Sequence, residues 1–121
     1  MPLASKRILL LEDEPIIAML AEDLLRSLGA SEIEREATLA DAERAVNGPS
    51  FDAALVDVDL QGESSLSLAG ELKRAGTPVV LASGYSHLTR EAADDFIVIA
   101  KPFTLAKLKT AFLQAFEHAD A

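Results

Sequence analysis

Residues 51–62 read FDAALVDVDLQG, and they give the first indication of the fold. The apolar run at residues 53–56 is typical of a short strand that is buried on both faces, and it stops at Asp57. A carboxylate at that point needs a partner or a functional reason, because burying an unpaired charge is costly. Asp57 is therefore the first candidate functional residue of the chain.

Other apolar runs lead into polar residues in the same way. They are residues 7–11 before Glu12 and Asp13, residues 79–82 before Ser83, and residues 96–99 before Lys101 and Pro102. A fifth strand is predicted over residues 31–37, nearer an edge of the sheet because this run is only weakly apolar.

Apolar residues at helical spacing separate these strands. Helices are predicted from Pro15 to Gly29, over Leu39–Val46 after a Thr38 N-cap, from Leu66 to Gly76, over residues 86–94, and from Leu105 after a Thr104 N-cap. Residues 62–65 are predicted to form a loop. Five strands that alternate with five helices predict an α/β fold with a doubly wound, five-stranded parallel sheet.

Composition narrows the class of protein. The 121 residues are enough for one domain, and half of them are hydrophobic. The formal net charge of −9 opposes direct binding to nucleic acid or to anionic membranes. The chain contains no cysteine, which excludes disulfides and thiolate metal sites. No apolar stretch approaches the roughly 20 residues that span a bilayer, and no signal peptide is recognised, so a soluble cytoplasmic protein is expected.

In parallel sheets the ligand site lies beyond the carboxyl ends of the strands, so the polar residues that follow them should meet. Glu12, Asp13 and Asp57 would repel one another unless a cation lies among them, and Mg²⁺ prefers such oxygen ligands. A carboxylate can also attack a phosphoryl group when the charge on the transferring oxygens is neutralised. Lys101 can pair with a phosphoryl oxygen, and the Ser83 hydroxyl can donate a hydrogen bond to another.

Each residue also has a simpler interpretation. Glu12 and Asp13 can be a solvated helix N-terminus, Asp57 a cap, Ser83 a turn hydroxyl and Lys101 a surface cation. Only their joint placement after the strands favours a shared site. The side chain of Asp59 is expected to point outward, and His87 and His118 are expected to be exposed without a chemical role.

With these residues placed, the chain resembles the receiver domain of two-component response regulators over essentially its whole length. Four motifs carry the resemblance: ILLLEDEP at residues 8–15, ALVDVDLQG at 54–62, VVLASGY at 79–85 and AKPF at 100–103. The resemblance implies a flavodoxin-like (βα)5 fold, with one receiver domain over residues 1–121, a core at about 6–118 and no output domain.

The resemblance also implies roles for individual residues. Asp57 would be the phosphoacceptor, and Ser83 and Lys101 would bind the phosphoryl group. Mg²⁺ or Mn²⁺ would be held by Asp13 and Asp57, by Glu12 directly or through water, and by the main-chain carbonyl of Asp59. The Lys101–Pro102 peptide bond would be cis.

The chain departs from the family pattern at the switch residues. The usual aromatic residue three positions before the lysine is replaced by Val98. Tyr85 lies two positions after Ser83, and Gly84 replaces the more common alanine, so LASGY resembles the FATGUY subgroup of alphaproteobacterial receivers. Tyr85 would either take over the aromatic signalling role or pack, partly buried, on the fourth helix.

The implied function is that of a stand-alone response regulator. A histidine kinase or a histidine phosphotransfer protein would phosphorylate Asp57, and a downstream protein would read the change through the fourth helix, fifth strand and fifth helix. The protein would be a monomer before phosphorylation and no enzyme beyond its own phosphorylation and dephosphorylation. Two alternatives stay open: a receiver-like binding module that works without phosphorylation, and a haloacid-dehalogenase-type phosphohydrolase that uses Asp57 and Asp59.

Overall fold

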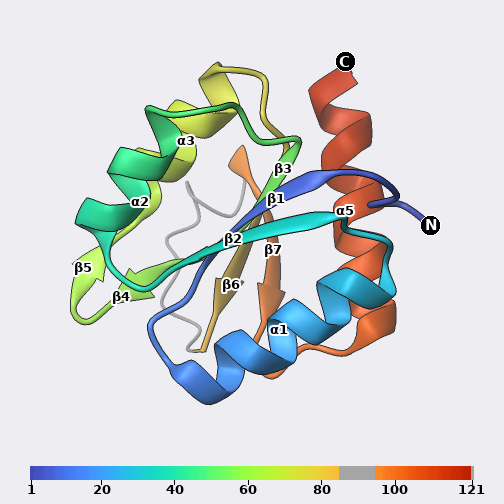
Figure 1. Ribbon diagram of the computed structural model, residues 1–121, viewed down its shortest axis with the longest axis horizontal. Helices are drawn as coiled ribbons and strands as arrows, with labels where there is room; N and C mark the ends of the chain where they lie inside the picture. The colour runs from blue at the N-terminus through green and yellow to red at the C-terminus, as the bar shows by residue number, and fades with distance from the viewer. Residues whose placement is uncertain (85–94, 121) are drawn as a thin grey trace.

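The computed structural model describes residues 1–84 and 95–120, and these form a five-stranded parallel sheet with helices on both faces (Figure 1). The strands are β1 (Arg7–Leu11), β2 (Glu32–Glu36), β3 (Ala53–Asp57), β6 (Val79–Ser83) and β7 (Ile97–Ala100). The helices are α1 (Pro15–Ser27), α2 (Leu39–Val46), α3 (Leu66–Arg74) and α5 (Leu105–Asp120). The predicted doubly wound fold is confirmed, while the helix predicted over residues 86–94 lies outside the described residues.

The sheet has the strand order β2-β1-β3-β6-β7, with every neighbouring pair parallel. The predicted edge position of the second strand is confirmed. The strand predicted over residues 96–99 is shifted by one residue, to Ile97–Ala100, and forms the other edge. The order in which strands are added to the sheet reverses between β1 and β3, so the crevice at their carboxyl ends is the place where ligands bind in such sheets.

Two hydrophobic clusters lie on opposite faces of the sheet. One cluster contains Ile8 and Leu10 of β1 together with residues of α1 and α5. The other contains Leu9 and Leu11 with residues of α2 and α3, and Figure 1 shows these helices on the other side of the sheet. Successive strand residues point to opposite faces, so a strand covered on both sides must be apolar throughout. This explains the uninterrupted apolar run of β1.

The prediction of a loop over residues 62–65 is wrong in part, because residues of this segment form one strand of a small antiparallel hairpin. It pairs β4 (Asp59–Leu60) with β5 (Glu63–Ser64). Gln61 and Gly62 form its tip with φ values of +53° and +88°, and two left-handed residues match the twist of a two-residue hairpin. Leu60 is 2% exposed and anchors the hairpin in the cluster on the α2 and α3 face.

Within the part of the chain that the structure describes, no helix is both long enough and apolar enough to cross a membrane.

Candidate functional site

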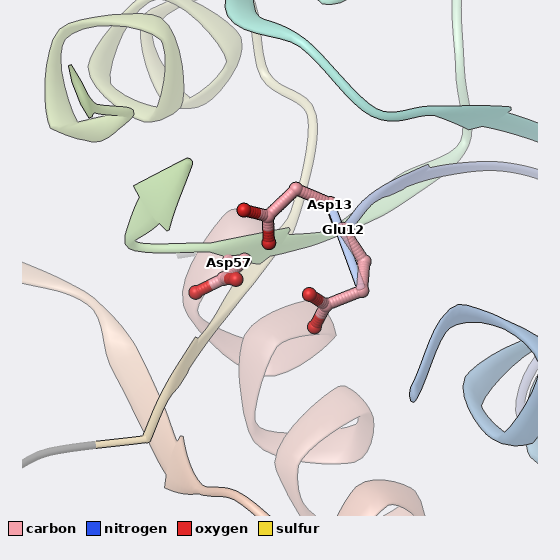
Figure 2. A group of neighbouring side chains, drawn as sticks. All are labelled: Glu12, Asp13 and Asp57. Atoms are coloured by element: carbon pink, nitrogen blue, oxygen red, sulfur yellow. The ribbon is translucent and has the colours of Figure 1, made fainter. Parts of the chain in front are cut away.

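Three carboxylates meet at the carboxyl ends of the two central strands. Glu12 and Asp13 directly follow β1 and Asp57 ends β3, and these strands are in register with Leu11 opposite Val56. One oxygen from each carboxylate lies within 4.8 Å of the others (Figure 2). Glu12 and Asp57 are each 4% exposed, so water screens their charges poorly. Such a cluster of oxygen atoms fits a hard divalent cation.

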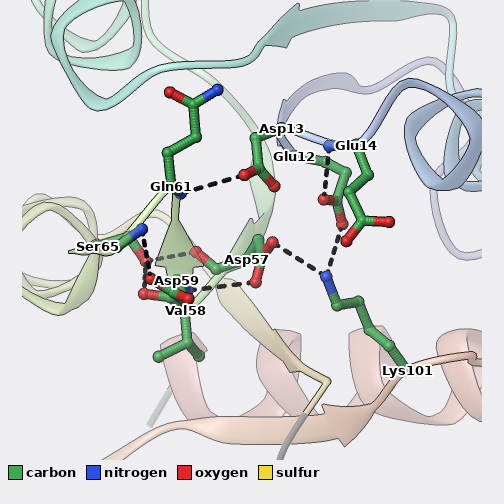
Figure 3. A network of polar contacts seen from close by, with 10 residues as sticks. Glu12, Asp13, Glu14, Asp57, Val58, Asp59, Gln61, Ser65 and Lys101 are labelled. Carbon is green, nitrogen blue, oxygen red and sulfur yellow. Dashed lines mark hydrogen bonds and ion pairs between the residues drawn. The ribbon is translucent and has the colours of Figure 1, made fainter.

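Lys101 lies between two of these carboxylates. Its Nζ atom is 3.0 Å from Asp57 Oδ2 and 3.1 Å from Glu12 Oε1, and its side chain is 10% exposed (Figure 3). The Lys101 N–H donates to the Ser83 carbonyl at 2.9 Å, which continues the pairing of β6 with β7. The Lys101–Pro102 peptide bond is cis. A buried cation therefore balances part of the negative charge.

The charges of the site shift the protonation of its members. Burial raises the pKa of Glu12 to about 7, against smaller opposing effects of hydrogen bonds from the Glu14 N–H and from Lys101. Burial alone would lower the pKa of Lys101, but its hydrogen bonds to Asp57 and Glu12 outweigh this and raise the pKa above its usual value. Lys101 therefore stays positively charged, whereas burial makes Glu12 harder to ionise than an exposed glutamate even with Lys101 beside it.

The β4–β5 hairpin covers the acidic cluster through backbone N–H groups. The Gln61 N–H donates to Asp13 Oδ2 at 3.1 Å, and the Asp59 N–H donates to Asp57 Oδ1 at 3.2 Å (Figure 3). The exposed side chain of Asp59 accepts from the Gly62 N–H at 3.1 Å. The backbone of Asp59 thus contacts Asp57, while its carboxylate accepts a hydrogen bond at the hairpin tip.

Ser65 is a site residue that the sequence reasoning missed. It is 0% exposed, and its Oγ donates to the Asp57 carbonyl at 2.6 Å, with the Val58 carbonyl at 3.2 Å. A serine before a helix is normally an N-cap, yet the Ser65 side chain makes no capping hydrogen bond to α3. Nothing in the local sequence distinguishes this role from ordinary capping.

The structure describes two of the three predicted switch residues, Ser83 and Gly84. Ser83 is half-buried at the end of β6, and Ala82 beside it pairs with Asp57. Gly84 lies close to Lys101, because a Cβ added there would come within 3.6 Å of the lysine Cε. Val98 is half-buried in β7 and packs against the cluster on the α2 and α3 face. Tyr85 and His87 lie outside the described residues, and His118 is exposed on α5.

A cleft of about 430 Å³ opens beside the carboxylates and Lys101. Asp13, Asp57, Asp59 and Lys101 supply its charged wall, and Ile17, Leu20 and Phe103 are among its apolar lining residues. The structure therefore brings together Glu12, Asp13, Asp57 and Lys101, with Ser83 and Asp59 at the adjoining strand ends. A cavity of this size has room for a phosphoryl group and a hydrated cation.

The fold and this cleft define a signalling domain of the receiver type. The model of the response regulator receiver domain matches residues 8–113, and the chain belongs to this family.

Individual relatives agree with this assignment. The chain is 34% identical to the phyllosphere-induced regulator PhyR of Methylorubrum extorquens over 89% of its own length, but spans only 42% of that protein. SdrG from Sphingomonas melonis Fr1 shares 36% identity with a TM-score of 0.81, covering 97% of this chain and 98% of SdrG. The receiver domain of Erythrobacter litoralis PhyR shares 31% identity with a TM-score of 0.83, covering 98% and 95%. These relatives are consistent with the FATGUY subgroup.

Proposed function

We propose that this receiver domain accepts a phosphoryl group on Asp57 from a histidine kinase or a histidine phosphotransfer protein, and that it signals by protein contact. The observation that carries the proposal is the ion pair between the buried Asp57 and Lys101. Asp13 lines the same cleft, and the buried Glu12 contacts Lys101 and belongs to the same carboxylate cluster. A structural ion pair alone would need no further carboxylates beside it, because uncompensated buried charge is destabilising.

Each residue of the site has a separate role in the transfer of the phosphoryl group. A carboxylate oxygen of Asp57 attacks the phosphorus atom, and the bond from phosphorus to the imidazole nitrogen of the donor breaks. Lys101 exchanges its contact with the Asp57 carboxylate for one with a phosphoryl oxygen, and the Ser83 hydroxyl donates a hydrogen bond to another phosphoryl oxygen. Glu12, Asp13, Asp57 and the Asp59 carbonyl would hold Mg²⁺ or Mn²⁺, which would supply positive charge to neutralise the transferring oxygens.

The surface beside the cleft supports a protein as phosphodonor. Ile16, Met19 and Leu20 of α1 are 82%, 59% and 45% exposed, and Leu20 also lines the cleft. Large apolar side chains grouped on a surface mark contact with a partner. A donor protein that covers this α1 face can place its phosphohistidine over Asp57.

The output surface is proposed at the β7 edge of the sheet. A groove of about 410 Å³ runs between β7 and α5, and its lining residues include Val98, Ala106 and Thr110. We assign the aromatic signalling role to Tyr85, because Val98 cannot supply it. The formal charge of −9 supports a monomer before phosphorylation and opposes contact with nucleic acid or anionic membranes. The proposed place of action is the cytoplasm.

Membership of the receiver family removes the support for a phosphohydrolase of the haloacid-dehalogenase type. The remaining alternative is a binding module that works without phosphorylation.

Phosphotransfer from a panel of histidine kinases tests the proposal. At least one kinase should label the wild-type chain, and Asp57→Asn should abolish the label. Asp59→Asn is the matched control, since its carboxylate serves the hairpin tip, and it should remain labelled. Equal labelling of wild type and Asp57→Asn would exclude Asp57 as the acceptor. A complete lack of labelling and of any response to small phosphodonors would favour the phosphorylation-independent module.

A further inference from the structure

The Asp13 carboxylate takes part in two sets of contacts. Its Oδ2 atom accepts the N–H of Gln61, which is 48 residues away in sequence, at 3.1 Å. The same carboxylate has an oxygen within 4.8 Å of ligand atoms on Glu12 and Asp57. Figure 2 shows the three carboxylates turned toward one another, and Figure 3 shows the contact with Gln61. One side chain thus connects the acidic cluster with the tip of the β4–β5 hairpin.

The base and the tip of this hairpin are held differently. At the base, Leu60 is buried in a hydrophobic cluster and Ser65 donates to the Asp57 carbonyl. At the tip, Gln61 and Gly62 are exposed, and the contact with Asp13 links Gln61 to the end of β1. Gln61 has a φ of +53°, which is unfavourable for a residue with a side chain, so this hydrogen bond helps to hold the tip.

Cation binding must compete for the charge of Asp13. A hydrogen bond to an ionised carboxylate is about twice as strong as one between neutral groups. A divalent cation that shares the carboxylate draws negative charge away from the oxygen that accepts the Gln61 N–H. The hydrogen bond to the tip therefore weakens, while Leu60 and Ser65 continue to hold the base.

We infer that cation binding at Asp13 releases the tip of the β4–β5 hairpin, so that the hairpin reports whether the metal site is filled. This inference rests on the proposed function, because it assumes a cation in the receiver cleft. The exposed residues of the hairpin then present a different surface to a partner in the filled state. By linkage, a partner that holds the tip docked on Asp13 lowers the affinity for the cation by the same factor.

Amide exchange with solvent, measured by NMR on the full chain during a Mg²⁺ titration, tests this inference. Saturating Mg²⁺ should raise the exchange rate of the Gln61 amide about fivefold, the effect of losing one ordinary hydrogen bond. The Gly62 amide is an internal reference, since its acceptor is the Asp59 side chain, and it should change less.

Two variants of Asp13 separate the hydrogen bond from the charge. Asp13→Ala removes the acceptor, so the Gln61 amide should exchange fast without Mg²⁺ and show no further increase with it. Asp13→Asn keeps a carbonyl oxygen as acceptor but loses the charge, so the Gln61 amide should exchange at a rate between those of the metal-free wild type and Asp13→Ala, and a Mg²⁺ concentration that saturates the wild type should not raise this rate. Asp13 is only partly buried, so both variants should fold, and their amide spectra will test this directly.

The outcomes distinguish the inference from the proposed function. Mg²⁺-dependent shifts of amides near Asp57, with an unchanged or slower Gln61 exchange rate, would overturn the inference and leave the metal site in place. A titration without any shift in the cleft would refute the metal site and the inference together.

Discussion

Lys101 Nζ lies 3.0 Å from Asp57 Oδ2, although 44 residues separate the two in sequence. The same Nζ lies 3.1 Å from Glu12 Oε1, across 89 residues. One cation thus holds together the ends of β1, β3 and β7, and its loss would leave two buried carboxylates facing each other.

Replacing Lys101 by Met should lower the free energy of unfolding of the metal-free protein by about 3 kcal/mol, because an uncompensated charge remains buried. Mg²⁺ should restore part of the loss by neutralising the carboxylates. Urea denaturation with and without Mg²⁺ measures both effects. Lys107→Met is the control: Lys107 is exposed on α5, and its loss should cost less than about 0.5 kcal/mol. Equal costs for the two variants would contradict the role of Lys101.

The pKa of Glu12 predicts an unusual pH dependence. Its pKa rises from 4.5 to about 7 on folding, so between these values the folded state binds a proton that the unfolded state has lost. The free energy of unfolding of the metal-free protein must then fall as the pH rises through this window, by about 1 to 3 kcal/mol from this residue.

Chemical denaturation of wild type and Glu12→Gln between pH 5 and about 7.5, in the presence of a chelator, checks this dependence. The difference in stability between the two proteins should shift in favour of the variant as the pH rises. Glu14→Gln, at an exposed neighbouring position, should keep the wild-type slope. A Glu12→Gln slope identical to that of wild type would contradict the shift in pKa.

Ser65→Ala should destabilise the protein by about 1 to 3 kcal/mol, because the buried Asp57 carbonyl loses its hydrogen-bond donor. Ser67→Ala, at an exposed position in α3, should be neutral or slightly stabilising, since alanine favours helix. Thermal or urea unfolding compares the two. A neutral Ser65→Ala would show that the hydrogen bond between Ser65 and Asp57 adds no net stability.

Ile16→Ala should slow phosphotransfer from a protein donor without affecting a small phosphodonor. Ile16 is 82% exposed on α1, so its removal leaves the core intact, but a covering partner loses an apolar contact. The expected loss in kcat/KM with a cognate kinase is about three- to tenfold. Leu113→Ala, which removes an exposed apolar side chain from α5, is the control and should transfer at the wild-type rate. Equal losses with acetyl phosphate and with the kinase would argue against an α1 docking face.

Much of the fold could be predicted because its signals are local. The apolar runs of β1, β3 and β6, the Thr38 cap and the helical spacing of α1 each depend on neighbours within a few residues. The general geometry of parallel sheets then places the residues after each strand at one edge. The β4–β5 hairpin was missed, because its DLQGES segment has no alternating apolar pattern and no Asn-Gly or Asp-Gly tip.

Apolar periodicity and residue type can be read along the chain, and they are enough to predict the parallel sheet and the candidates Glu12, Asp13, Asp57, Ser83 and Lys101. How these groups contact one another depends on the folded chain: Lys101 contacts both Glu12 and Asp57, Ser65 donates to the Asp57 carbonyl, and Asp13 accepts a hydrogen bond from the hairpin tip. Such contacts depend on rotamers, on burial and on distances of a few ångströms between segments far apart in sequence. Local sequence patterns therefore cannot predict them.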